Sequence, residues 1–186
     1  MHRILLVFIL SLIIAAGCSN SYQEAEAIDL AAVGLSASEQ LGTFSTKFDP
    51  ASDEGRATNI KLASDAINQV VVKPGEEFSF NKTVGPTTEK NGYKLSVIYV
   101  SGKKDEGYGG GVCQVSSTLF NAANSAGMTI VERHDHSLPV AYVEAGKEAA
   151  TSYGVKDFRF TNDLGHPVKI TSNVTGGTIS ISVNAA

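Results

Sequence analysis

The chain has 186 residues, enough for one domain with short additions, and its 42% hydrophobic and 18% charged content is typical of a globular protein. The formal net charge is −4 at pH 7, and no basic stripe runs along the sequence. These values argue against a nucleic-acid-binding protein, so we expect no nucleic acid among its partners.

The first segment has the pattern of an export signal. A basic residue, Arg3, precedes an apolar run over residues 4–16, which is too short to cross a bilayer and is typical of the apolar part of a signal peptide. The run leads into Ala15-Ala16-Gly17-Cys18, which resembles a bacterial lipobox. We therefore expect a lipoprotein signal peptide over residues 1–17 and a lipid on the sulfur of Cys18, with an ordinary cleaved signal peptide as the alternative.

The domain is expected to follow a tether. Residues 18–40 are rich in Ala, Glu and Ser and are expected to be a flexible link to a domain that covers residues 41–186. At its start, alternation of side chains predicts a strand over residues 41–48.

Two segments have helical periodicity. The first predicts a helix over residues 56–71, with its apolar stripe at Ile60, Ala63, Ile67 and Val71. The second predicts a helix over residues 113–126, with its stripe at Val115, Leu119, Ala122 and Ala126. Gly127 stands where a helix C′ glycine is expected.

The remaining segments are predominantly β in character. Residues 102–111 are rich in glycine and are expected to form a loop. Turn residues at 162–165 and 175–177 predict that the last three strands form consecutive hairpins. Together the elements predict an α+β fold, with two helices packed on a largely antiparallel sheet and with C-terminal β-hairpins. The further strands are expected at residues 76–81, 94–102, 128–133, 138–143, 149–154, 157–162, 168–174 and 178–184.

Cys113 follows three glycines at the expected start of the second helix. The first turn of a helix offers unpaired N–H groups and a positive dipole end, which favour the reactive thiolate form of a cysteine. Gly109, Gly110 and Gly111 can adopt positive φ and form an anion-binding turn, whose amides would serve as an oxyanion hole in acyl transfer. Gln114 can donate a further hydrogen bond. The alternative is that Cys113 is a small buried apolar residue beside a structural turn.

A reactive thiol needs a base, and His134 and His136 are the candidates. In an extended segment both rings lie on one face, and an acid such as Asp157 can orient the ring that pairs with Cys113. A further alternative is a zinc site formed by Cys113, His134 and His136. Because no fourth ligand stands out, we expect neither a metal nor another cofactor.

Arg56 and Asn59, at positions i and i+3 of the first helix, can hold a loop or a substrate carboxylate. Simple solvation of a helix surface is favoured over both functions.

Six motifs are together specific for one family. They are FST at 44–46, RATNIKLASDAIN at 56–68, PGEEFSFNKTVGP at 74–86, GGGVCQVSSTLFNAA at 109–123, VERHDHSLPVAYV at 131–143 and YGVKDFRFTN at 153–162. Over nearly all of residues 41–184 the sequence resembles the VanW family, here in a lipoprotein form. The family motif G-G-G-x-C-Q-x-S/T-S/T falls on residues 109–117, R-x-x-H-S on residues 133–137, and D-x-x-F-x-N on residues 157–162.

This resemblance implies a cell-envelope protein held at the outer side of the cell membrane. It favours His136 over His134 as the functional histidine. It also implies substrate-binding roles for Gly109, Gly110, Gly111, Gln114, Ser116, Arg133 and Asn162. The chain departs from the family pattern at residues 146–150, where Glu148 replaces the more usual aspartate.

Two functions are compatible with these residues. In the first, the protein is a thiol acyl-transferase or amidohydrolase that acts on peptidoglycan peptides. Cys113 would be its nucleophile, His136 its base, and Asp157 or Asn162 the group that orients the base. In the second, the protein is a non-catalytic module that binds cell-wall peptide through the same groove, and Cys113 is structural.

Overall fold

The computed structural model describes residues 39–100 and 102–186. The expected signal peptide, the expected lipidation at Cys18 and almost all of the expected tether lie outside the described residues. Within the described part of the chain, every helix is too short or too polar to cross a membrane.

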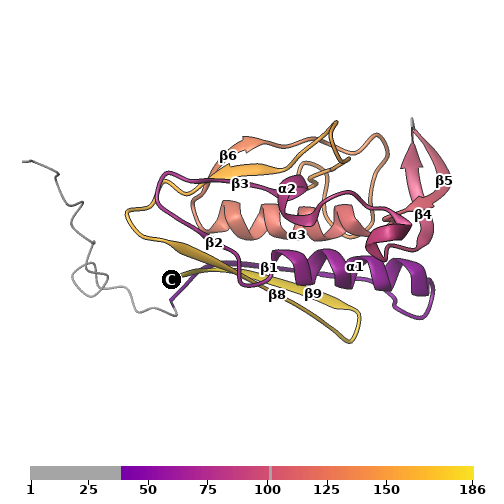
Figure 1. The fold of residues 1–186 in the computed structure, drawn as a ribbon, viewed down its shortest axis with the longest axis horizontal. Coiled ribbons are helices and arrows are strands. Elements are labelled where there is room, and N and C mark those ends of the chain that lie inside the picture. The colour runs from indigo at the N-terminus through magenta and orange to yellow at the C-terminus, as the bar shows by residue number, and fades with distance from the viewer. Residues whose placement is uncertain (1–38, 101) are drawn as a thin grey trace, which may run out of the picture.

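Two helices lie side by side between two antiparallel sheets (Figure 1). These are α1 (Glu54–Ile67) and α3 (Val112–Ser125). The larger sheet has the order β1-β9-β8-β2, and the smaller has the order β3-β7-β6. The strands of the larger sheet are β1 (Gln40–Lys47), β9 (Thr178–Ala185), β8 (Val168–Thr175) and β2 (Val71–Val72). Those of the smaller sheet are β3 (Glu77–Ser79), β7 (Arg159–Thr161) and β6 (Thr129–Glu132).

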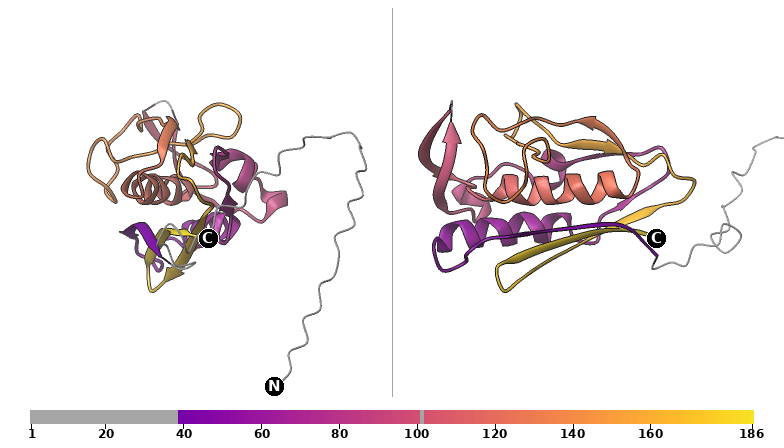
Figure 2. Two further views of the ribbon diagram at one scale, coloured as in Figure 1. Left: turned by 90° about the vertical axis from the view of Figure 1, so that its left-hand side faces the viewer. Right: turned by 180° about the vertical axis from the view of Figure 1, so that it is seen from behind.

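A hairpin closes one end of these layers. It consists of β4 (Leu95–Val100) and β5 (Lys103–Tyr108), which pair only with each other. A short helix, α2 (Phe80–Val84), and the 3-10 turn η1 (Glu89–Asn91) precede it. Both α1 and α3 begin at the hairpin end of the molecule, as the views from the front and from behind show (Figures 1 and 2). The N-terminal turns of the two long helices are thereby brought to the same place.

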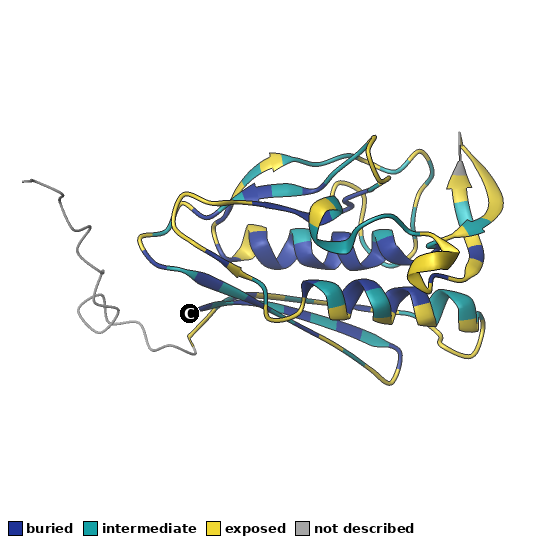
Figure 3. Ribbon diagram, viewed as in Figure 1, coloured by how far each residue is buried: buried dark blue, intermediate teal, exposed yellow. Residues whose placement is uncertain are grey.

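The core lies on both sides of α3, which is buried around most of its circumference (Figure 3). Leu119 of α3, Ile60 of α1, Phe160 of β7 and Ile181 of β9 are all 0% exposed. Burial of each such side chain contributes about 1.5–3 kcal/mol to folding. Buried polar residues of α3 have hydrogen-bond partners. The Thr118 hydroxyl, for example, lies 2.8 Å from the Thr46 hydroxyl.

The predicted α+β class is confirmed, and so is a C-terminal hairpin, formed by β8 and β9 around Gly176-Gly177. The hairpin expected at residues 162–165 is absent, because β7 pairs with β3 and β6 while β8 belongs to the other sheet. At this turn the chain leaves the smaller sheet and enters the larger one.

Other differences have local causes. Helix α1 ends at Ile67 and not at residue 71, since Gln69 adopts φ 65° and Val71-Val72 pair with β8. Residues 103–108, expected as loop, form β5 because β4 supplies a partner strand. Residues 138–143 form no strand, and residues 149–154 contribute one isolated bridge, Ser152 to Lys156.

Candidate active site

The glycine turn before α3 is fixed by close packing. Gly109 and Gly111 adopt φ 88° and 102°, in the left-handed region that favours glycine. At Gly110 a Cβ atom would lie 2.5 Å from the carbonyl oxygen of Val97, so no larger residue fits. The carbonyl of Gly110 also accepts a 3.0 Å hydrogen bond from Asn59 of α1. The loop-holding function considered for Asn59 is therefore observed.

Backbone amides at this turn are available to a ligand. The amides of Val112 and Gln114 donate to the carbonyls of Gly109 and Gly111, at 3.1 and 3.0 Å. Within residues 39–100 and 102–186, the amides of Gly111 and Cys113 donate to no protein acceptor. The start of α3 thus retains unpaired donors beside the thiol.

A cavity of about 250 Å³ opens at this end of the molecule. It is lined by the three glycines, Cys113, His136, Tyr142, Thr151 and Arg56, among others. The structure therefore brings together residues from the glycine turn, from α1 and from the segment between β6 and β7.

Cys113 is half-buried and has one residue as its hydrogen-bond partner, Thr151. The Cys113 thiol donates to the carbonyl oxygen of Thr151 at 3.3 Å. The amide of Thr151 donates to the Cys113 sulfur at 3.4 Å. Thr151 thus contacts the sulfur both as an acceptor and as a donor, and these contacts hold the sulfur in place.

His136 shares the cavity, and its ring contacts Tyr142. The Tyr142 hydroxyl lies 3.3 Å from Nε2 of His136, while Nδ1 is buried and has no hydrogen-bond partner within the described residues. In the same part of the chain, no hydrogen bond joins the His136 ring to the Cys113 sulfur. Burial lowers the pKa of His136, so the ring is neutral at pH 7 and able to accept a proton.

The Tyr142 side chain interacts with both His136 and Cys113. Burial raises the pKa of Tyr142 far above its usual range, and the proximity of Cys113 raises it further. The hydroxyl is therefore protonated, contacts His136 directly and lies within electrostatic range of Cys113.

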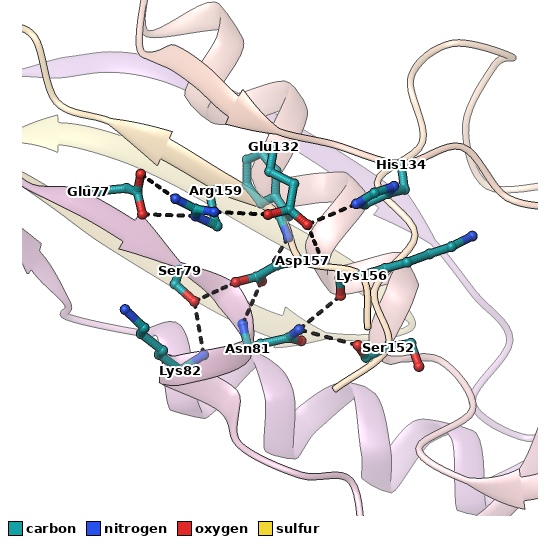
Figure 4. A network of polar contacts seen from close by, with 11 residues as sticks. Glu77, Ser79, Asn81, Lys82, Glu132, His134, Ser152, Lys156, Asp157 and Arg159 are labelled. Carbon is teal, nitrogen blue, oxygen red and sulfur yellow. Dashed lines mark hydrogen bonds and ion pairs between the residues drawn. The ribbon is translucent and has the colours of Figure 1, made fainter. Parts of the chain in front are cut away.

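The ring of His134 is engaged elsewhere. Its Nε2 lies 2.9 Å from a carboxylate oxygen of Glu132, and the same carboxylate pairs with Arg159 at 3.1 Å (Figure 4). Among the described residues no group of His, Cys, Asp and Glu has the arrangement of a metal site. The zinc site considered for Cys113, His134 and His136 is thus not formed.

Asp157 does not lie with Cys113 and His136. Its carboxylate accepts hydrogen bonds from the Ser79 hydroxyl at 2.5 Å and from the amides of Asn81 and Phe158 at 2.8 Å (Figure 4). It lines a separate cavity of about 540 Å³ on the β3–β7 side. Asp157 therefore stabilises the start of α2 in this geometry, instead of orienting His136.

The charges of two acids do reach His136, Glu148 with the larger effect and Asp135 with the smaller, while Lys156 acts in the opposite direction. Glu148 is the acid that lies beside the cavity wall fixed by Arg133. It opposes the effect of burial by raising the pKa of His136, and one of its carboxylate oxygens accepts a 2.7 Å hydrogen bond from the amide of Gly146. Glu148 lies where the chain departs from the family pattern. The sequence alone did not predict an effect of this acid on His136.

Of the other predicted ligand-binding residues, Gln114 lines the cavity, while Ser116 and Arg133 support its wall. The Ser116 hydroxyl donates to the carbonyl of Ala149 at 2.6 Å, and Arg133 donates to that of Glu148 at 2.7 Å. Both side chains thereby fix the segment that leads to Thr151.

Asn162 is fully buried and lies at the turn between β7 and β8, outside the cavity. Its side-chain amide donates to the carbonyls of Val72 and His166, both at 2.9 Å, and its oxygen accepts from the amide of Leu164 at 3.0 Å. These contacts connect the two sheets. The geometry therefore gives Asn162 a structural function.

We expect Asn162→Ala to lower the free energy of unfolding by about 2–4 kcal/mol, because two buried carbonyls lose their donor. Urea unfolding followed by circular dichroism measures this change. The exposed residue Asn173 of β8 is the control, since Asn173→Ala removes one surface side-chain contact, to Thr175. A change below about 0.5 kcal/mol at Asn162 would contradict the structural function.

Burial of His136 also has a consequence for stability. The pKa of His136 is lowered in the folded chain relative to the ordinary value of 6.5, so at mildly acidic pH the unfolded chain binds a proton that the folded chain does not. The stability of the folded chain should therefore fall as the pH drops below about 6.5. Urea titrations at pH 7.5 and 5.5 should show a smaller fall in His136→Gln than in the unaltered protein; equal falls would contradict this burial.

The comparisons with known proteins agree with the motifs. A family model described as "VanW like protein" matches residues 55–184. This chain belongs to the VanW-like family. The matched range includes the glycine turn, Cys113, His136 and every other lining residue named above for the cavity.

Two curated relatives of the VanW-like chain are similar over most of the domain. One is the uncharacterized protein YoaR of Bacillus subtilis (strain 168), 46% identical over 145 residues, which are 78% of this chain and 48% of the relative. The other is the vancomycin B-type resistance protein VanW of Enterococcus faecalis (strain ATCC 700802 / V583), 33% identical over 128 residues, which are 66% of this chain and 46% of the relative. The chain thus spans about half the length of these relatives. No solved structure matches it.

The residue patterns of the VanW-like chain pointed to Cys113 and to the His134–His136 pair, but not to Tyr142 or Thr151. Thr151 contacts the sulfur through its backbone carbonyl and amide and through its hydroxyl, which lies 3.8 Å away, and no motif in the sequence marks a threonine so distant along the chain. Tyr142 stands in a segment expected as a strand, where an aromatic residue is unremarkable. Tyr142 and Thr151 lie near the thiol because the segment between β6 and β7 folds back to the start of α3.

Proposed function

We propose that the protein is a thiol-dependent acyl-transferase or amidohydrolase of the cell envelope that acts on peptidoglycan peptides. The observation that carries this proposal is the shared cavity of Cys113, His136 and the glycine turn. A nucleophile, a neutral base and unpaired amides are the groups that acyl transfer needs.

In the proposed reaction the sulfur of Cys113 attacks a peptide carbonyl carbon, and His136 takes the thiol proton. The amides of Gly111 and Cys113 stabilise the oxyanion that forms. The C–N bond then breaks, and His136 returns its proton to the leaving amine. The resulting thioester is cleaved by water in hydrolysis or by a second amine in transfer, and either route regenerates the thiol.

The contacts already present support parts of this sequence of steps. Thr151 fixes the position of the sulfur from both sides, which limits the number of orientations for attack. The lowered pKa of His136 keeps the ring able to accept a proton at neutral pH. Tyr142 fixes the ring through Nε2 and is itself too weakly acidic to lose its proton.

We further propose that the protein works outside the cytoplasm, anchored to the cell membrane through a lipid on Cys18. The support is the sequence of residues 1–18 alone, in which a short apolar run ends at small residues and a cysteine. Two or more acyl chains would hold the domain at the membrane without a spanning helix, since each buried methylene contributes about 0.8 kcal/mol.

A second candidate is a non-catalytic module that binds cell-wall peptide in the same cavity. It is favoured by one observation: the Cys113 thiol donates to the Thr151 carbonyl, while His136 contacts Tyr142. In this function the sulfur would be a structural hydrogen-bonding group, and ligand binding would leave it unmodified.

Incubation of the full chain with peptidoglycan stem peptides, followed by mass spectrometry of protein and peptides, separates the two candidates. The enzyme predicts shortened or cross-linked peptides and a thioester adduct on the protein, both absent in Cys113→Ala. The binding module predicts unchanged peptides and retention of peptide by both proteins in equilibrium dialysis. Peptides that are neither changed nor retained would refute both candidates.

A further inference from the structure

Arg56 is the side chain with a fixed charge in the cavity that holds Cys113. The other described lining residues include no aspartate, glutamate, lysine or second arginine. The cavity therefore has a net positive charge, in a protein whose overall charge is negative.

The guanidinium of Arg56 is held in place by a neutral partner. Its Nη2 donates to Oε1 of Gln114 at 2.6 Å. The side-chain nitrogen of Gln114 donates to the Thr46 hydroxyl at 3.1 Å and to the Lys47 carbonyl at 2.9 Å. These two contacts fix the amide so that its oxygen faces Arg56, and the arginine is oriented before any ligand arrives.

Within the described parts of the chain, none of the ion pairs includes Arg56. The charge of Arg56 contributes to the lowered pKa of Asp53, but the Asp53 carboxylate is hydrogen-bonded elsewhere: it accepts from the backbone amide of Arg56 at 2.8 Å and from the Ser96 hydroxyl at 2.6 Å. Arginine carries five N–H donors in a planar fork, and Gln114 occupies one of them. The remaining donors match a carboxylate.

We propose that Arg56 binds the free C-terminal carboxylate of a peptide, so that the last peptide bond is presented to Cys113. This assignment rests on the proposed function and names its substrate class. Gln114, the partner of Arg56, directly follows Cys113, and the Cγ atom of Arg56 packs against Gly111. Arg56 and Cys113 also line the same cavity of about 250 Å³, so one ligand in that cavity can contact both side chains.

The size of the cavity agrees with a chain end. Its volume of about 250 Å³ is below the roughly 300–1,000 Å³ of sites that enclose a drug-sized ligand. A space of this volume has room for the last residues of a peptide. In the reaction, Cys113 forms a thioester with the penultimate residue, the C–N bond breaks, and the terminal amino acid leaves with the proton from His136.

The test compares one synthetic stem peptide in two forms, with a free C-terminal carboxylate and with a C-terminal amide. The unaltered full chain should turn over the carboxylate form with kcat/KM about 10–100-fold higher, typical of a charge-assisted pair. Arg56→Gln should treat the two forms alike, and Arg56→Lys should retain part of the preference because the charge remains without the fork. Lys61→Gln, on the exposed side of α1, should keep the full preference.

Equal turnover of both forms by the unaltered chain would overturn the assignment of Arg56 while leaving the proposed function intact. If neither form is turned over, the proposed enzyme fails, and calorimetric binding of the two peptides to Cys113→Ala tests Arg56 by itself. A tighter Kd for the carboxylate form, lost in Arg56→Gln, supports the assignment; equal Kd values overturn it. Inorganic phosphate that binds more tightly than the peptide would also overturn it, in favour of a phosphate site.

Discussion

Cys113→Ala is expected to reduce the turnover of peptidoglycan peptides by at least about a thousandfold, because removal of a nucleophile eliminates the covalent route. The fold should persist, since the sulfur is half-buried and, among the described residues, Thr151 alone forms hydrogen bonds with it. Turnover is measured by liquid chromatography of the peptides, and folding by circular dichroism of the same samples.

Cys113→Ser is the matched variant for this result. A serine hydroxyl can keep the contacts to the carbonyl and the amide of Thr151, but it is a much weaker nucleophile than a thiolate. It should therefore lose activity nearly as completely as alanine while it retains full stability. Activity above about a tenth of that of the unaltered chain in either variant would show that the sulfur does not carry the reaction.

His136→Gln is expected to lower kcat by about 10²–10⁴-fold, the usual contribution of a general base. In the unaltered chain, activity should persist below pH 6.5 and then decline as the pH falls through the lowered pKa of His136, where the ring becomes protonated. In His136→Gln the residual activity should lack this acidic decline. The measurement is the dependence of kcat/KM on pH for both proteins.

The control for this prediction is His134→Gln. The ring of His134 contacts Glu132 and lies outside the lining of the cavity, so its removal should change kcat by less than about threefold. A large loss at His134 with little loss at His136 would reverse the assignment of the base.

The elements that the sequence predicted well are those whose period is maintained over several turns. Helix α3 begins and ends within one residue of its predicted bounds, because it is packed on both sides and therefore carries a long apolar stripe. Strand β5 was missed since its residues, KKDEGY, lack apolar alternation, and its pairing depends on the adjacent β4. The β7 segment was recognised, but its partner strands β3 and β6 were not. Strand pairing depends on residues that are far apart in the sequence.

The site shows the same difference between local and distant signals. The glycine turn and Cys113 are close together in sequence. The expected helix start at Cys113 was enough to predict unpaired amides beside the thiol. The position of Asp157 depends on Ser79 and Asn81, which bind its carboxylate from an element far away in the sequence. Likewise, only the fold brings Arg56 of α1 to the start of α3.

The central claim is that Cys113 is a reactive thiol accessible from the cavity. It is tested most directly by the rate of iodoacetamide alkylation of the native full chain at pH 6, with the label located by peptide mass so that Cys113 is distinguished from Cys18. Cys113 is predicted to be labelled faster than the cysteine of an unstructured peptide, and more slowly in His136→Gln. A native protein in which Cys113 is labelled only after unfolding would contradict the account.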